Sequence, residues 1–217
     1  GTKTTAIGFE ALMSQNFTSN TDSYNVAVGY TAGREITTGT QNVLIGGLSG
    51  DAITTGTNNV AMGTSSLGTC TTGTYNVALG DSALFATTTA SNNTAVGGGA
   101  LTANTTGASN VAVGRSALDA NTTGARNVAI GYDSLGANTT ASNNTAVGNA
   151  SLDANTTGTS NVALGRNALS ANTTANNNTA VGMNALLVNT TGAQNTSTGA
   201  ESLEANTTGD FNTAYGY

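Results

Sequence analysis

Several residue types on which protein chemistry commonly depends are missing or scarce in this chain. It has no His, no Trp and no Pro, a single Cys, and only 7% charged residues. The lack of His excludes a His-ligated metal and a His general base, and one Cys can form neither an internal disulfide nor a thiolate zinc site. Five Lys and Arg against eleven Asp and Glu give a net charge of −6. So few cations exclude nucleic-acid binding by phosphate neutralisation.

The chain is instead dominated by three small or polar residue types. Thr (42), Asn (29) and Gly (29) make up 100 of the 217 residues. No apolar run approaches the roughly 18 residues of a membrane helix, so we expect no membrane insertion. Because the chain opens on Gly1 without a Met or a secretion signal, we expect it to be processed or cut from a longer protein.

A glycine that closes a short apolar run recurs along the whole chain. From the second of these anchor glycines onward, one stands at every seventeenth position, and only the first interval is longer, by four residues. The anchor glycines are Gly8, Gly29, Gly46, Gly63, Gly80, Gly97, Gly114, Gly131, Gly148, Gly165, Gly182, Gly199 and Gly216. So strict a register predicts that each unit stacks on the next. The four extra residues of the first interval predict a loop insertion at 13–24.

The residues before each anchor glycine predict a short β-strand. They read Asn, Val or Thr, Ala and a large aliphatic residue, as in 127–130. Strand residues alternate between faces, so the Val or Thr and the large aliphatic residue share one face and the Ala takes the other. A Leu follows four residues after most anchor glycines, and a Thr-Thr pair, usually followed by Gly, marks a turn. We therefore predict two short strands and two turns in each 17-residue coil.

This pattern predicts an all-β fold, a parallel β-solenoid or β-roll of about 12 to 13 coils. We expect an elongated rod formed by a single repeat array over 1–217, with coils about 4.8 Å apart. A helical repeat is excluded because Thr, Asn and Gly are poor helix formers and no apolar 3, 4, 7 spacing is present. We expect stacked aliphatic side chains to supply most of the core, and each coil to depend on its neighbours for stability.

An asparagine stands four residues before every anchor glycine except the first. We predict a structural ladder in which these side-chain amides bond to their copies in adjacent coils. Its members are Asn25, Asn42, Asn59, Asn76, Asn93, Asn110, Asn127, Asn144, Asn161, Asn178, Asn195 and Asn212.

The segments 25–29, 127–131 and 144–148, which read Asn-Val-Ala-Val-Gly, Asn-Val-Ala-Ile-Gly and Asn-Thr-Ala-Val-Gly, resemble the head repeats of YadA-like trimeric autotransporter adhesins. The same units, with their Ala-Leu and Asn-Thr-Thr-Gly parts, are similar to repeats of phage tail-fibre proteins. The resemblance covers essentially the whole chain, although the repeat here is slightly longer and very uniform. It implies a left-handed parallel β-roll, three chains side by side, and a role in attachment at a surface.

A second asparagine recurs in the motif Asn-Thr-Thr, which matches the acceptor pattern for N-linked glycosylation. The candidate sites are Asn104, Asn121, Asn138, Asn155, Asn172, Asn189 and Asn206. The Thr pairs could equally carry O-linked sugars. A structural reading is also open, because Asn and Thr are good turn residues.

Other functions have weaker support in the sequence. An ice-binding Thr array needs Thr at alternating positions, whereas here the Thr are adjacent. The sequence offers no set of side chains for acid–base catalysis, because the carboxylates occupy varying repeat positions. We interpret them as solvent-exposed surface residues. We therefore expect no catalytic residues, no cofactor and no metal, and we interpret Cys70 as a space-filling residue.

Together these patterns predict a non-enzymatic structural rod of an extracellular fibre or adhesin that mediates attachment. Its expected partner is itself, as a trimer or an end-to-end filament, with a host receptor or glycan as a further candidate. The alternative within the same class is a subunit of a self-assembling, glycosylated extracellular filament.

Overall fold

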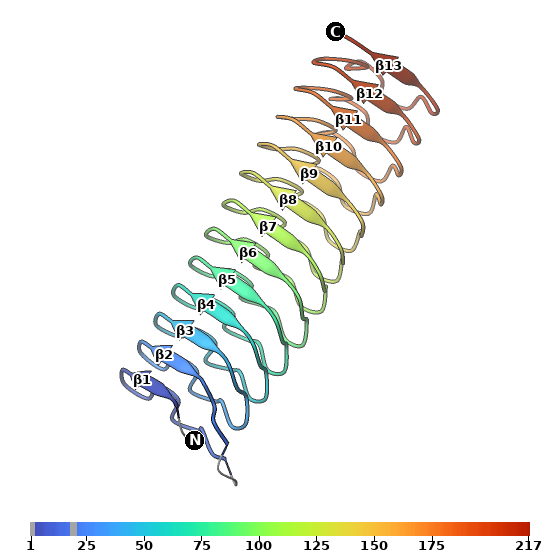
Figure 1. The fold of residues 1–217 in the computed structure, drawn as a ribbon. Coiled ribbons are helices and arrows are strands. Elements are labelled where there is room, and N and C mark those ends of the chain that lie inside the picture. Colours follow the sequence, from blue (N-terminus) through green and yellow to red (C-terminus); the bar gives the residue numbers. More distant parts are fainter. Residues whose placement is uncertain (1–2, 18–20) are drawn as a thin grey trace. The chain divides into compact units, whose positions relative to one another are not determined.

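The computed structural model describes residues 3–17 and 21–217, and the chain divides into two compact units. Unit 1 comprises residues 1–109 and unit 2 comprises residues 110–217. Among the described residues, no helix is long and apolar enough to cross a membrane. Each unit is a stack of similar coils (Figure 1).

Every described coil contributes one strand of three residues. In unit 1 these are β1 (Thr5–Ile7), β2 (Val26–Val28), β3 (Val43–Ile45), β4 (Val60–Met62), β5 (Val77–Leu79) and β6 (Thr94–Val96). In unit 2 they are β7 (Val111–Val113), β8 (Val128–Ile130), β9 (Thr145–Val147), β10 (Val162–Leu164), β11 (Thr179–Val181), β12 (Thr196–Thr198) and β13 (Thr213–Tyr215). Within each unit the strands pair in parallel and in sequence order. The predicted all-β parallel solenoid is confirmed.

The 17-residue register of the sequence is the register of the sheet. Val60 pairs with Val77 in unit 1, and Val128 pairs with Thr145 in unit 2. The first pair of strands has the longer offset of the first interval, since Thr5 pairs with Val26. The Asn16 N–H donates to the Thr37 carbonyl, and the Gln41 N–H donates to the Ser23 carbonyl, in the positions that later coils repeat. These bonds place the four extra residues within 17–22, inside the predicted 13–24 insertion, of which 18–20 lie outside the described residues.

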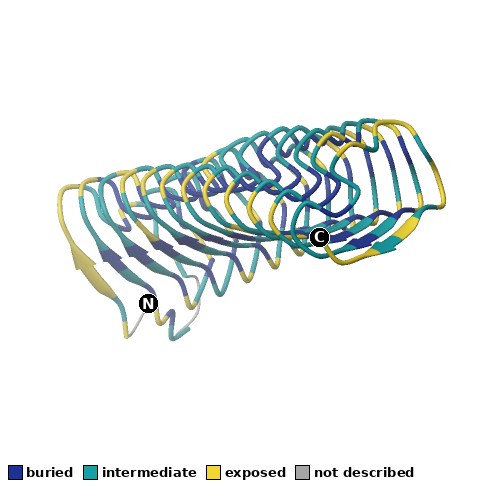
Figure 2. Ribbon diagram, turned by 90° about the horizontal axis from the view of Figure 1, so that it is seen from above, coloured by how far each residue is buried: buried dark blue, intermediate teal, exposed yellow. Residues whose placement is uncertain are grey.

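The strands turn their small residue inward and their large residues outward. The central residue of β5, Ala78, has no exposed surface, whereas the flanking Val77 and Leu79 are half-buried. Buried and half-buried segments recur along the coils of each unit (Figure 2). The interior of most coils consists of these alanines, an Ala or Ser three residues after the anchor glycine, the Leu after it, and asparagine, and unit 1 adds Ile36, Leu44, Ile53 and Cys70. The expected stacking of aliphatic side chains in the core holds for the Leu four residues after the anchor glycine, but the large aliphatic residues at the strand ends face outward. So short a coil leaves space for Ala, but not for Val or Ile, opposite the Leu.

The predicted second strand is absent from the described coils. In its place the residues two and four positions after the anchor glycine adopt positive φ, for example Ser82 at 55° and Leu84 at 53°. This alternation of hand prevents an extended strand. The segment still bonds to the next coil, since the Leu84 N–H donates to the Ala100 carbonyl over 3.0 Å.

The anchor glycines are required because neighbouring coils approach closely there. At Gly131 φ is 135°, and an added Cβ would lie 2.4 Å from the Gly148 carbonyl oxygen. Any side chain would therefore push two coils apart, and the backbone conformation itself is one that favours glycine. This contact explains the strict recurrence of glycine in the sequence.

Candidate interaction surface

The most extensive surface feature of each unit is the outward side of its strands. We call this the outward strand face, and it is formed by the first and third residues of β2–β6 in unit 1 and of β7–β12 in unit 2. In unit 1 nine of its ten residues are aliphatic and the tenth is Thr94; in unit 2 eight of twelve are aliphatic and four are Thr. Several are well exposed, such as Met62 at 47%, Ile130 at 39% and Leu164 at 37%.

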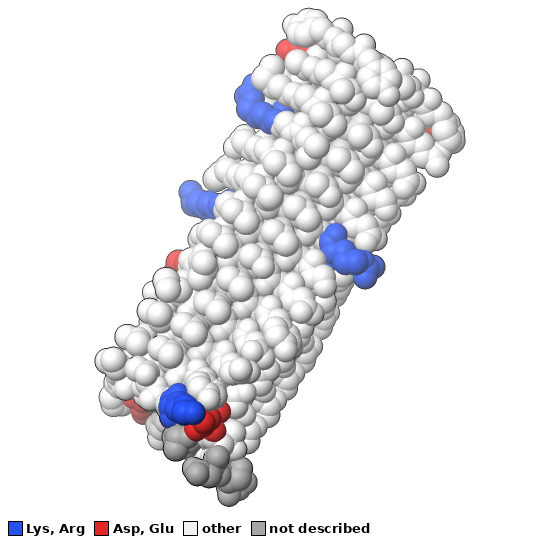
Figure 3. Space-filling model, viewed as in Figure 1, with Lys and Arg blue, Asp and Glu red and all other residues white. Residues whose placement is uncertain are grey.

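No residue of the outward strand face carries a charge. The Lys, Arg, Asp and Glu side chains lie on other repeat positions, and Figure 3 shows a largely white surface with few coloured side chains. A contiguous exposed apolar surface on a soluble protein commonly marks a site of association. The sequence predicted that the large strand residues share a face, but not that this face lies outside.

The asparagine four residues before each anchor glycine connects coils in two ways. In unit 1 the Asn59 N–H donates to Asn42 Oδ1 over 3.0 Å, and Asn59 Nδ2 donates to the Gly73 carbonyl over 2.9 Å. Unit 2 repeats both bonds, for example from Asn144 to Asn127 Oδ1 and to the Gly158 carbonyl. The predicted bond between side-chain amides is also present in several coils, as from Asn59 Nδ2 to Asn42 Oδ1 over 3.1 Å, so both the backbone N–H and the amide donate between coils. We call this set the strand-side ladder. All of its asparagines from Asn25 to Asn195 are buried.

The asparagines of the Asn-Thr-Thr motif form a second ladder, which we call the turn-side ladder. Asn138 Nδ2 donates to Asn121 Oδ1 over 2.9 Å and to the Ala141 carbonyl over 3.1 Å. The same carbonyl also accepts a bond from Asn127 of the strand-side ladder over 2.8 Å. The two ladders of unit 2 therefore converge on one carbonyl in each coil, at the residue that follows the Thr pair.

These contacts argue against N-glycosylation at the candidate sites and favour the structural reading of the motif. Asn104, Asn121, Asn138, Asn155, Asn172 and Asn189 have no exposed surface, and Asn206 is half-buried. Both amide hydrogens of Asn155 are donated within the protein, to Asn138 Oδ1 and to the Gly158 carbonyl. A sugar on Nδ2 would replace one hydrogen and would have to occupy the interior. Six of the seven motif asparagines therefore belong to the interior, and Asn206 is partly enclosed.

The described residues bring together no group of three His, Cys, Asp or Glu able to hold a metal, and they form no pocket. Burial raises the pKa of the carboxyl groups of Asp51, Asp119 and Asp153. The single thiol, Cys70, is buried, and desolvation raises its pKa to about 11. It occupies the repeat position of the turn-side asparagines, where it fills space.

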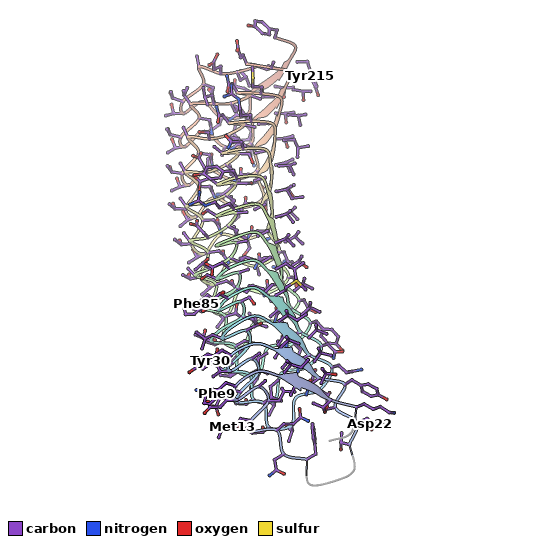
Figure 4. The ribbon with its side chains drawn as sticks, turned by 90° about the vertical axis from the view of Figure 1, so that its left-hand side faces the viewer. Phe9, Met13, Asp22, Tyr30, Phe85 and Tyr215 are labelled. Carbon is purple, nitrogen blue, oxygen red and sulfur yellow. The ribbon has the colours of Figure 1, made fainter. Side chains whose placement is uncertain are left out.

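Aromatic side chains are mostly exposed and dispersed. Phe9 and Tyr30 stand at the same position of two neighbouring coils and stack with ring centroids 5.5 Å apart and an interplanar angle of 9° (Figure 4). Lys3 lies 5.1 Å from the centre of the Tyr24 ring and forms an ion pair with Asp22. These contacts tie the first two coils together across the insertion.

No protein-family model, no curated protein and no solved structure matches this chain.

Proposed function

We propose that the protein is a non-enzymatic structural segment of an extracellular fibre or adhesin, whose copies associate through the outward strand face. The observation that carries the proposal is the character of this face: uncharged, mostly aliphatic, and partly exposed in every coil of β2–β12. Burying it against other copies would remove apolar surface from water, which is the dominant favourable term in protein association.

The regular interior supports a mechanical role. Each coil is tied to the next by strand pairing and by the asparagine ladders, so the stack resists local unfolding while its turns vary. The resemblance of the Asn-x-Ala-aliphatic-Gly units to adhesin head repeats and to tail-fibre repeats supports an attachment fibre and association of three chains.

Light scattering on the purified chain tests the proposal. We expect a mass of three chains, close to three times 21.2 kDa. The variant Ile45→Lys/Met62→Lys/Leu79→Lys places three charges on the outward strand face of unit 1, and we expect it to be monomeric with an unchanged circular dichroism spectrum. Burial of unpaired charges in an interface is strongly unfavourable.

The matched control places the same charges in the same coils at the turns before the strands, as Gln41→Lys/Asn58→Lys/Tyr75→Lys, and should remain trimeric. A monomeric wild type, or a face variant that still forms trimers, would refute association through this face. Growth to masses that rise with concentration would indicate end-to-end filaments instead.

A further inference from the structure

The two residues of each Thr pair have different structural roles. The hydroxyl of the first Thr donates to the carbonyl of the first Thr in the next coil, as from Thr71 to Thr88 over 3.2 Å and from Thr122 to Thr139 over 3.0 Å. The first Thr is half-buried in most coils. Its retention along the chain therefore follows from the bonding between coils.

The second Thr is exposed in all eleven coils that contain the pair. It is Thr38, Thr55, Thr72, Thr89, Thr106, Thr123, Thr140, Thr157, Thr174, Thr191 and Thr208. Its backbone N–H reaches the next coil, as from Thr123 to the Thr139 carbonyl over 3.3 Å. Across residues 3–17 and 21–217, none of these eleven hydroxyl groups forms a hydrogen bond to the protein.

Other exposed positions of the repeat change freely from coil to coil. The residue before the strand-side asparagine is Tyr75, Asn92, Ser109 and Arg126 in four successive coils, and all four are exposed. The repeats have thus diverged wherever solvent is the only neighbour. A preference for a β-branched residue would also admit Val or Ile at the second Thr. The retained feature is a hydroxyl that the protein itself does not use, which points to a chemical partner outside the chain.

We propose that Oγ1 of the second Thr in each pair is the acceptor for an O-linked sugar. The co-substrate is a nucleotide-activated sugar, held by a separate glycosyltransferase. The Thr oxygen attacks the anomeric carbon, the bond from that carbon to the nucleotide diphosphate breaks, and the nucleotide leaves with the electron pair. The hydroxyl proton passes to a base on the transferase. The first Thr is protected by its bond to the next coil, and the asparagines by their burial.

Neighbouring acceptors lie one strand spacing apart, ~4.8 Å. Sugars on adjacent coils therefore compete for space, and we expect partial occupancy along the file of second Thr residues. Attached sugars would cover one edge of the coils with hydroxyl groups.

The test is the intact mass of the protein purified from the cells that produce it, followed by fragmentation that preserves sugar linkages. We expect a mass above the 21.2 kDa of the chain, in increments of a sugar residue, with the sugars on second Thr residues. A mass equal to that of the bare chain overturns the proposal. Sugars confined to first Thr residues or to asparagine overturn it as well.

Two variants produced in the same cells sharpen the test. Thr123→Val keeps the β-branch and removes the acceptor, so the sugar at 123 should be lost with no change in thermal stability. Thr122→Val removes the bond to the Thr139 carbonyl, so stability should fall while the sugar at 123 remains. An unchanged sugar content at this coil in Thr123→Val would contradict the proposal even if other sites are modified.

Discussion

The two units fill one interior position of the coil in different ways. Seven residues after the anchor glycine, unit 1 has Gln15, Ile36, Ile53, Cys70, Thr87 and Asn104, whereas unit 2 has asparagine in every coil from Asn121 to Asn206. In three coils of unit 1 this position holds Ile or Cys, and in unit 2 it is the turn-side ladder throughout. The coil therefore accepts either solution, provided that space is filled and the nearby carbonyl has a donor.

A second difference concerns the residue four positions after the anchor glycine. It is Leu in unit 2 but Gly33 and Gly50 in two coils of unit 1. Leu44 replaces the central strand Ala in β3, and its side chain lies beside both glycines. A Cβ at Gly50 would lie 2.7 Å from Leu44 Cδ2 and 2.9 Å from Ile53 Cδ1. Leu44 and Ile53 thus occupy the volume that the Leu fills in other coils. The filled volume of the interior is kept, although different residues supply it.

The largest expected loss of stability differs between the units because the carbonyl after the Thr pair has different numbers of asparagine donors. The Gly73 carbonyl in unit 1 accepts from one asparagine, and the Ala141 carbonyl in unit 2 accepts from two. Asn59→Ala in unit 1 leaves the Asn76 N–H and the Gly73 carbonyl unsatisfied, because Cys70 Sγ, at 3.9 Å, is too weak a donor. Asn127→Ala in unit 2 leaves only the Asn144 N–H, since Asn138 still donates to the Ala141 carbonyl. At about 1–3 kcal/mol for each buried unsatisfied group, we expect losses of about 2–6 and about 1–3 kcal/mol.

Urea unfolding of the two variants measures this difference. The double variant Asn127→Ala/Asn138→Ala removes both donors from the Ala141 carbonyl, and its loss should exceed the sum of the two single losses. Equal destabilisation by Asn59→Ala and Asn127→Ala would show that the turn-side ladder does not compensate for a bond lost from the strand-side ladder.

The next largest loss of stability tests whether Leu44 fills the space that the Leu four residues after the anchor glycine fills in other coils. Leu44→Ala opens a cavity beside Gly33 and Gly50 and should cost about 2–5 kcal/mol. Gly50→Leu alone overfills the same space and should cost about 1–3 kcal/mol. The positive φ of Gly50, 55°, equals within a degree that of Leu67 in the next coil, so the backbone accepts the Leu.

The combination Leu44→Ala/Gly50→Leu recreates the Ala61 and Leu67 pair of the following coil. We expect its destabilisation to be smaller than the sum of the single variants, as measured by thermal unfolding. Additive losses would mean that the two residues do not compete for one space.

The smallest effect compares two carboxyl groups at the same repeat position. Burial is the largest cause that raises the pKa of both Asp51 in unit 1 and Asp153 in unit 2; the charge of Arg34 partly opposes it at Asp51, and a hydrogen bond with Ser170 partly opposes it at Asp153. A carboxyl with a raised pKa stabilises the fold at low pH, and this stability is lost as the pH rises from 3.8 through the folded pKa. Asp153→Asn should therefore raise stability slightly at pH 7 and leave it unchanged near pH 3.

Asp51→Asn should likewise raise stability at pH 7 and leave it unchanged near pH 3 in the same thermal unfolding series. Asp81→Asn, at an exposed position, controls for the loss of one negative charge. A gain at pH 3 equal to that at pH 7 would rule out ionisation as the cause.

Much of the fold can be predicted from the sequence, because the anchor glycines are required where the backbones of two neighbouring coils come into contact. Their spacing predicts the register, and the Val-Ala-aliphatic pattern predicts the strand. The inside and outside of the strand are not predicted, because alternation alone does not say which face is enclosed. Hydrophobicity favours the side with Val128 and Ile130, but the width of the coil admits only Ala129.

The burial of the Asn-Thr-Thr asparagines had a signal in the sequence. The same repeat position holds Ile36, Ile53 and Cys70, residues that are typical of interiors. Aligning the early and late repeats at this position indicates that the asparagine is enclosed. The positive φ of Leu84 and its copies is less accessible, since Leu seldom adopts it, although Gly33 and Gly50 at that position were a hint.

The pairing of every interior group with its counterpart one coil away has a consequence for length. Removing residues 128–144 from unit 2 would join Asn127 directly to Thr145, and the resulting Asn-Thr-Ala-Val-Gly is a sequence that the chain already contains. All interior donors, acceptors and side chains would find equivalent neighbours. Removing a single residue instead would turn Ala outward and leave an asparagine facing the wrong carbonyl. The regular coils of unit 2 can therefore be removed or added only as whole 17-residue units.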